Sequence, residues 1–134
     1  MAISGLVITY NEEKYIERCV KTLFKVCDEV IIIDSFSADK TAEIAENHGA
    51  KVYFQKFLGD GPQRIHGLQF CKNDWILNPD ADEFLEEDAL QFIKDNSYLN
   101  DKYDGYEFRR NNYLGNEIIY FSLLFQISFG ELGN

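Results

Sequence analysis

Two aspartates, Asp80 and Asp82, follow closely after the apolar stretch WIL in the segment DWILNPDADEFLEED. In an extended backbone, side chains two positions apart point to the same side. Two carboxylates on one side form half of a site for Mg²⁺ or Mn²⁺, ions that keep open positions for phosphate groups. The spacing therefore indicates a divalent metal site. The later acids Glu86, Glu87 and Asp88 are instead typical of a helix N-terminus.

Other uses of paired acids can be compared with the sequence. A calcium loop of the EF-hand type needs an oxygen ligand at its fifth position, glycine at the sixth and glutamate at the twelfth. Counted from Asp80, these positions hold Phe84, Leu85 and Gln91, which excludes such a loop. A phosphatase with an aspartate nucleophile carries D-x-D after its first strand, and a nucleotidyltransferase has a glycine-rich loop there. The first apolar stretch ends in TYNEE, which fits neither class.

Four apolar stretches predict strands, and the first of them is rich in β-branched residues and predicts a buried strand. They lie near residues 3–9, 29–34, 51–54 and 73–78. Helical spacing of apolar residues lies between them, first from Glu12 to Val26, where Asn11 is the expected N-cap. Strands that alternate with helices form βαβ units and a mainly parallel sheet. We therefore expect a three-layer α/β fold with the first strand in the interior of the sheet.

The rest of the chain predicts more helices and a pair of strands. Helical patterns occupy 38–49 and 60–72 and resume after Leu85, and residues 105–121 alternate like a hairpin. The apolar stretch from Ile118 to Phe129 has no clear period. We expect it to lack covering, so that it either packs in an altered way or is covered by a second copy of the chain, which would make a homodimer.

Polar residues follow three of the predicted strands. Thr9, Tyr10 and Glu12 leave the first strand, Asp34 ends the second, and Asp80 begins the acidic segment after the fourth. In an open α/β sheet, ligands bind outside the carboxyl ends of the strands. These segments are far apart in the sequence, but they can therefore converge on one ligand.

Composition limits the classes of partner. Thirteen basic residues against twenty-three acidic residues give a net charge of −10, which would repel a phosphate backbone and excludes nucleic acid. Three cysteines without C-x-x-C spacing predict buried thiols in a reducing compartment. No run reaches the roughly 18 apolar residues of a transmembrane segment, and no basic region precedes the first apolar run. The expectation is a single cytoplasmic domain over residues 1–134.

Four segments carry a resemblance to a known family. They are LVITYNEEKYIERCVKTL, DEVIIIDSFSADKTAEIAENHGAKVY, GPQRIHGLQ and DWILNPDADEF. In this order they resemble the nucleotide-binding half of an inverting family-2 glycosyltransferase with the GT-A fold, especially the β-glycosyltransferases of the lipopolysaccharide core. The resemblance covers about residues 3–120. It implies a Rossmann-like nucleotide-sugar-binding domain in an enzyme of the cytoplasm or of the inner membrane face.

The resemblance implies a place for the base of a UDP-sugar donor. Thr9, Tyr10 and Glu12 resemble the segment that cradles the uracil, where a tyrosine can stack on the ring. Asp34 resembles the aspartate that accepts a hydrogen bond from the base. Two simpler interpretations remain open: Tyr10 as a core aromatic residue and Asp34 as a cap of the following turn.

The resemblance also implies a place for the diphosphate. Arg64 is similar to a basic residue that approaches the nucleotide, although it could equally be a surface arginine. Asp80 and Asp82 resemble the D-x-D pair, the second of which binds the Mn²⁺ or Mg²⁺ that bridges the diphosphate. The acceptor implied is a cell-surface glycan or lipopolysaccharide, which can be lipid-linked.

The catalytic base is not identified by this comparison. Inverting transfer needs a base for the acceptor hydroxyl, and the family carries it beyond the D-x-D pair, in an acceptor-binding half. The late acids Glu107 and Glu117 do not match that motif, so the acceptor half is expected to be missing from this chain. Two functions stay open: an active glycosyltransferase, and a truncated remnant that binds nucleotide-sugars without catalysis.

Overall fold

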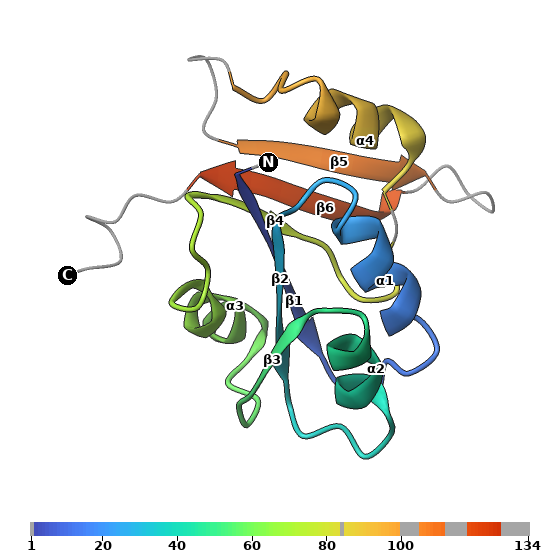
Figure 1. Ribbon diagram of the computed structural model, residues 1–134, viewed down its shortest axis with the longest axis vertical. Coiled ribbons are helices and arrows are strands. Elements are labelled where there is room, and N and C mark those ends of the chain that lie inside the picture. Colours follow the sequence, from blue (N-terminus) through green and yellow to red (C-terminus); the bar gives the residue numbers. More distant parts are fainter. Residues whose placement is uncertain (1, 84, 100–104, 112–117, 127–134) are drawn as a thin grey trace.

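The computed structural model describes residues 2–83, 85–99, 105–111 and 118–126, which form a six-stranded sheet with helices on both faces (Figure 1). The strands are β1 (Ile3–Thr9), β2 (Glu29–Asp34), β3 (Lys51–Phe54), β4 (Trp75–Asn78), β5 (Gly105–Asn111) and β6 (Ile118–Gln126). The helices are α1 (Ile16–Leu23), α2 (Thr41–Asn47), α3 (Asp60–Leu68) and α4 (Glu87–Lys94). The four strands predicted from apolar stretches are thus confirmed.

The sheet has the strand order β3-β2-β1-β4-β6-β5. Strands β1 to β4 pair in parallel, while β6 runs antiparallel to both β4 and β5. The prediction of a mainly parallel sheet with β1 in its interior is confirmed. The carboxyl ends of β1, β2 and β4 therefore lie at one edge of the sheet, and Thr9 is the register partner of Asp34 there.

Alternating side chains of the strands belong to two hydrophobic clusters, one on each face of the sheet. Ile3 and Val7 of β1 pack with buried residues of α1, α2 and α4. Leu6, one position out of phase with these, packs with Ile31, Ile33, Ile76 and Leu68 of α3. Because β1, β2 and β4 are buried on both faces, their sequences are mostly continuous apolar runs, as is usual for parallel sheets. The three-layer arrangement is confirmed.

The first helix is shorter than its sequence pattern. Helix α1 begins at Ile16 rather than Glu12, and its N-cap is Tyr15 rather than the expected Asn11. Asn11 has a positive φ of 52°, and its side chain accepts a hydrogen bond from the backbone N–H of Ala38 at 2.8 Å. The N-cap prediction is therefore wrong, because Asn11 fixes the loop after β1 to the loop after β2.

Strand β6 contains most of the apolar stretch from Ile118 to Phe129. Its described part, up to Gln126, lies inside the sheet between β4 and β5, and Leu124 is fully buried. Leu124 is thus covered by its own chain, whereas the side chains of residues 118–123 lie outside those that the structure describes, so covering by a second copy stays a prediction. Residues 127–129 lie outside the described residues.

Two further expectations concern cysteines and membrane segments. Cys19 and Cys27 are buried free thiols, as predicted, whereas Cys71 is partly exposed. No helix in the described part of the chain has the length and apolar character that crossing a membrane would require.

Candidate functional site

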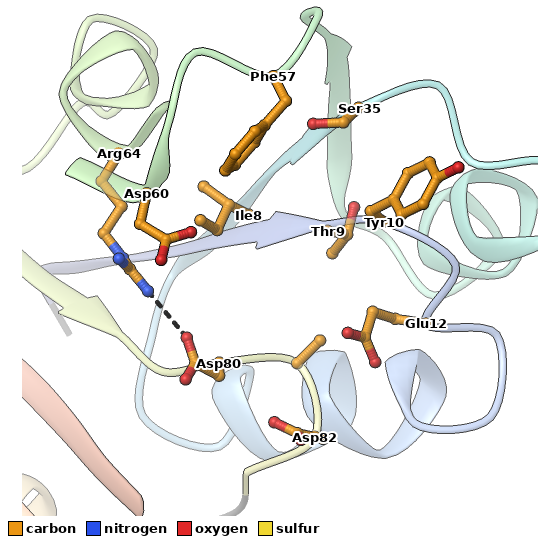
Figure 2. Close-up of a pocket in the computed structure, with 11 residues that line it drawn as sticks. Ile8, Thr9, Tyr10, Glu12, Ser35, Phe57, Asp60, Arg64, Asp80 and Asp82 are labelled. Atoms are coloured by element: carbon orange, nitrogen blue, oxygen red, sulfur yellow. Dashed lines mark hydrogen bonds and ion pairs between the residues drawn. The ribbon is translucent and has the colours of Figure 1, made fainter. Parts of the chain in front are cut away.

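A cavity of about 350 Å³ opens at the carboxyl edge of the sheet (Figure 2). Its lining comes from the ends of β1, β2 and β4, from the segment between β3 and α3, and from α3 itself. The lining residues are Ile8, Thr9, Tyr10, Glu12, Ser35, Phe57, Asp60, Arg64, Asp80, Ala81 and Asp82. Six of the seven site residues predicted from the sequence are thus brought together, and the exception is Asp34.

Helix α3 carries Arg64 to this cavity. One turn further along, Gly67 packs so closely on the sheet that an added Cβ would lie 2.6 Å from Leu6 Cδ1 and 2.9 Å from Ile33 Cγ1. This close approach lets the Arg64 side chain reach over the end of β4. There, Arg64 Nη2 donates to Asp80 Oδ1 at 2.8 Å, and the two side chains point toward each other (Figure 2).

Asn78, the last residue of β4, holds the same arginine from the other side. Its side chain is 6% exposed. In the amide orientation that satisfies both of its polar atoms, its nitrogen donates to Leu6 O at 2.8 Å and its oxygen accepts from Arg64 Nε at 2.9 Å. Sequence reasoning missed Asn78, because an asparagine after an apolar run is equally typical of a turn.

Negative charge dominates the cavity. Among the described residues that line it, four are carboxylates and one is a guanidinium. Partial burial raises the pKa of Glu12, and the nearby Asp82, Asp80 and Asp39 raise it further. In Figure 2, Glu12 and Asp82 face the cavity on the side opposite Arg64. A cation would relieve this repulsion.

The segment from Asp80 to Glu83 forms a tight turn. The backbone N–H of Asp80 donates to Glu83 Oε1 at 2.9 Å, and the backbone N–H of Glu83 donates to Asp80 O at 3.0 Å. Arg18 of α1 anchors the same turn, because its Nη2 donates to Asp82 O at 3.1 Å. Burial of the Glu83 carboxyl, together with the adjacent Asp80 and Asp82, raises its pKa to about 7. The turn is thus fixed through its backbone while the two aspartate side chains remain exposed.

Asp80 and Asp82 are the residues that the sequence predicts to hold a metal ion. The described part of the chain holds no group of three or more histidine, cysteine, aspartate or glutamate residues that could hold a metal ion. Asp80 and Asp82 nonetheless offer two exposed carboxylates of the hard-oxygen kind that Mg²⁺ and Mn²⁺ prefer. Such ions are commonly bound by one or two carboxylates together with substrate phosphates. The donor set fits an ion that a phosphate ligand completes.

Asp34 lies behind the cavity rather than in its wall. It is fully buried, and its carboxylate accepts from Thr9 Oγ1 at 2.7 Å and from the backbone N–H and Oγ of Ser37 at 2.8 and 2.6 Å. The carboxylate therefore caps the turn after β2, the simpler of the two interpretations of its sequence position. Direct contact between Asp34 and a base stays a prediction.

An apolar cavity of about 520 Å³ adjoins the acidic one and shares Tyr10, Ser35 and Phe57 with it. Phe36 and Lys56 complete its lining. Tyr10 is 60% exposed, so it is not a core aromatic residue. Rings that line an open apolar cavity can stack on a planar ligand. Sequence analysis had identified Tyr10 but missed both phenylalanines.

Gln63 fixes the wall between the two cavities. It is fully buried on α3, and its Oε1 accepts from the backbone N–H of Leu58 at 3.0 Å. Its Nε2 donates to Ser35 Oγ and to Gln55 O, both at 3.1 Å. One side chain thus ties the segment that carries Phe57 to the end of β2.

The sequence model described as glycosyl transferase family 2 matches residues 4–123, which include every residue of the acidic cavity. The chain belongs to this family. The family resemblance inferred from the four sequence segments is confirmed.

Two curated relatives of this family-2 glycosyltransferase chain show how much of a longer protein it resembles. An uncharacterized glycosyltransferase of Rickettsia bellii is 47% identical over 68% of this chain and 32% of its own length. The lipopolysaccharide core biosynthesis glycosyltransferase LpsC of Rhizobium meliloti is 28% identical over 85% of this chain and 44% of its own length. The chain therefore spans less than half the length of either relative.

Solved structures place the family-2 chain in the GT-A fold. TarS of S. aureus has a TM-score of 0.65 at 26% identity, over 87% of this chain and 37% of that one. Glucosyl-3-phosphoglycerate synthase of Mycobacterium tuberculosis, solved with Mn²⁺ and uridine diphosphate, has a TM-score of 0.54 at 26% identity, over 60% of this chain and 33% of that one. The predicted fold class is thus confirmed.

Proposed function

We propose that the chain binds a UDP-sugar and a divalent cation, and that it forms the donor-binding part of a glycosyltransferase that acts on a cell-surface glycan or lipopolysaccharide. The observation that carries this proposal is the convergence of Arg64, Asp80 and Asp82 on one acidic cavity that adjoins an aromatic one. A nucleoside diphosphate has the same two halves, a planar base and a charged diphosphate.

The base belongs in the aromatic cavity. Tyr10, Phe36 and Phe57 offer ring faces for stacking. Ser35 Oγ already accepts from Gln63 Nε2, so its own proton is free to be donated to a carbonyl oxygen of the base, and Lys56 offers a second donor. A uracil, which carries two carbonyl groups, suits these donors. Asp34 supports this wall by holding Thr9 and Ser37 in place.

The diphosphate belongs in the acidic cavity, which needs added positive charge to hold a negatively charged ligand. Asp80 and Asp82 would hold Mn²⁺ or Mg²⁺, which would supply charge neutralisation for a departing nucleoside diphosphate. Arg64 contributes the cation of the chain itself, because its guanidinium already points into this cavity. The synthase of Mycobacterium tuberculosis solved with Mn²⁺ and uridine diphosphate supports this assignment by analogy.

The acceptor and the catalytic base rest on other observations than the donor site does. The side chains of Glu107 and Glu117, the late acids considered from the sequence, lie outside those that the structure describes. The similarity to LpsC of Rhizobium meliloti supports a lipopolysaccharide acceptor, and with it a location at the inner membrane face. The expectation that residues 1–134 form one donor-binding domain is part of the same proposal.

A thermal-shift measurement tests donor binding most directly. UDP with Mn²⁺ should raise the unfolding temperature, and at about a hundred times its dissociation constant it should add about 2.7 kcal/mol to the free energy of unfolding. UDP with a chelator should give a much smaller shift, because four carboxylates then face the diphosphate. No shift under either condition would contradict the proposal.

A nucleotide-sugar-binding module without catalysis is the second candidate function, favoured by the limited share of each relative that the chain spans. Both candidates predict UDP binding, so only turnover separates them. We expect little or no transfer by these 134 residues alone, because positioning an acceptor supplies several kcal/mol of barrier lowering. Measurable transfer from a UDP-sugar to a lipopolysaccharide acceptor would establish the enzyme instead.

A further inference from the structure

Asn78 connects three elements at the end of β4. The parallel pairing of β1 with β4 ends at Gly5 and Leu77. One residue beyond it, the side-chain nitrogen of Asn78 donates to Leu6 O in place of a backbone hydrogen bond between the strands. The side-chain oxygen of Asn78 accepts from Arg64 Nε of α3. The buried Asn78 thus links the end of the β1–β4 pair to the arginine of α3.

The Arg64 guanidinium is held at two of its nitrogens. Nε donates to the Asn78 oxygen at 2.9 Å, and Nη2 donates to Asp80 Oδ1 at 2.8 Å. A guanidinium is planar, so two hydrogen bonds to different nitrogens fix both its position and its plane. Among the described residues its other N–H groups have no hydrogen-bond partner, so they can be shared with a ligand in the cavity.

The two partners of Arg64 differ in charge, and this difference matters for ligand binding. Asp80 is an exposed carboxylate that would also be drawn to a divalent cation, so its bond to Arg64 is exchangeable. Asn78 is neutral and nine-tenths buried, so its bond can persist without cancelling the positive charge. A carboxylate at position 78 would compete with phosphate for the same guanidinium.

We propose that Asn78 is a positioning residue for the diphosphate. It keeps Arg64 Nε fixed, so that the terminal nitrogens can turn from Asp80 to the phosphate oxygens while the guanidinium stays over the cavity. A long side chain that is already ordered loses less conformational entropy when it binds. This inference rests on the proposed function, because it assigns the residue that prepares Arg64 for the donor.

The experiment compares UDP with uridine, which has the same base and ribose but no phosphate. With Mn²⁺ present, Asn78→Ala should weaken UDP binding by about tenfold and change uridine binding less than about twofold. In an Arg64→Lys background, which keeps the charge but has no Nε, the same substitution should change UDP binding less than about twofold. Equal losses for UDP and uridine, or an equal loss in the Lys background, would overturn the proposal.

Asn73→Ala is the matched control. Asn73 precedes β4 at the opposite edge of the sheet, where its Nδ2 donates to Asp28 Oδ1 at 2.6 Å. Its removal should leave the ratio of UDP to uridine affinity unchanged. A change equal to that of Asn78→Ala would show that loss of any polar bond next to β4 is enough, which would also overturn the proposal.

A second measurement needs no ligand. The Arg64 Nε–H signal in a nitrogen-15 NMR spectrum, identified by its loss in Arg64→Lys, should exchange slowly with water in the native chain and at least about tenfold faster in Asn78→Ala. Unchanged exchange would refute the hydrogen bond between Arg64 Nε and Asn78. If this hydrogen bond is present and the native chain binds no UDP, then the proposed function and the assignment to the diphosphate both fail, and the hydrogen bond is only structural.

Discussion

Thr9 and Asp34 face each other across β1 and β2, and the Thr9 hydroxyl donates to the Asp34 carboxylate at 2.7 Å. Thr9 lines the acidic cavity, whereas Asp34 lies behind it and also accepts two hydrogen bonds from Ser37. A fully buried carboxylate with every one of these bonds in place stabilises the loops that form the cavity wall. Its first role is therefore to organise the wall.

Replacing Asp34 should accordingly lower stability. Asp34→Ala removes three hydrogen bonds to a charged acceptor and leaves buried donors unsatisfied, so we expect a loss of about 2 to 4 kcal/mol in the free energy of unfolding. Urea denaturation measures this loss. An unchanged free energy of unfolding together with lost UDP affinity would instead show that Asp34 acts on the base directly, as the family resemblance implies.

Asp82 should determine the metal dependence of UDP binding. In Asp82→Ala, Mn²⁺ should no longer strengthen UDP binding, because the remaining Asp80 offers a single carboxylate ligand. Calorimetric titration of UDP with and without Mn²⁺ measures the difference. Asp88→Ala, which removes an acid from the first turn of α4, is the control and should retain the metal dependence. An undiminished metal effect in Asp82→Ala would place the ion elsewhere.

Glu83 should make the folded chain less stable as the pH rises. Burial raises its pKa from an ordinary 4.5 to about 7 in the folded state, so between these values the folded chain binds a proton that the unfolded chain has lost. Stability from this group is full below pH 4.5 and falls until about pH 7, by at most about 3 kcal/mol. Glu83→Gln should flatten this part of the profile in urea denaturation between pH 5 and 8. An equally steep profile would contradict the prediction.

Gly67 should tolerate no side chain, in contrast to another glycine of the same helix. Gly67→Ala would force Leu6 and Ile33 to move, and we expect it to destabilise the fold by about 1 to 3 kcal/mol despite the better helix propensity of alanine. An added Cβ at Gly61 meets nothing within 4 Å, so Gly61→Ala should be neutral or stabilising. Equal thermal unfolding of the two variants would show that α3 can shift away from the sheet.

Local patterns specified several parts of the site. The continuous apolar runs of β1, β2 and β4 identified strands that are buried on both faces, and parallel strands bring their carboxyl ends to one edge. That geometry was enough to bring Glu12 and Asp82 into one cavity although they are 70 residues apart in the sequence. The spacing of Asp80 and Asp82 likewise placed both in the cavity lining.

Local patterns failed where the outcome depended on a distant partner. The start of α1 moved because Asn11 bonds to the loop after β2, which no helical period records. The position of β6 between β4 and β5 depends on pairing between strands, and a strand segment carries little local information on its neighbours.

The sequence by itself determined the order of strands and helices, and it indicated that the loops after β1, β2 and β4 meet at one edge of the sheet, because these follow from periodicity and from the rules of parallel sheets. The family followed from the resemblance of four sequence segments. Only the tertiary structure decided how buried polar groups are shared there. There, Asp34 accepts hydrogen bonds from Thr9 and Ser37, and Gln63 bonds to the segment that carries Phe57. A buried polar side chain must be hydrogen-bonded, but its partner is chosen by packing in three dimensions and leaves no signal in the neighbouring residues.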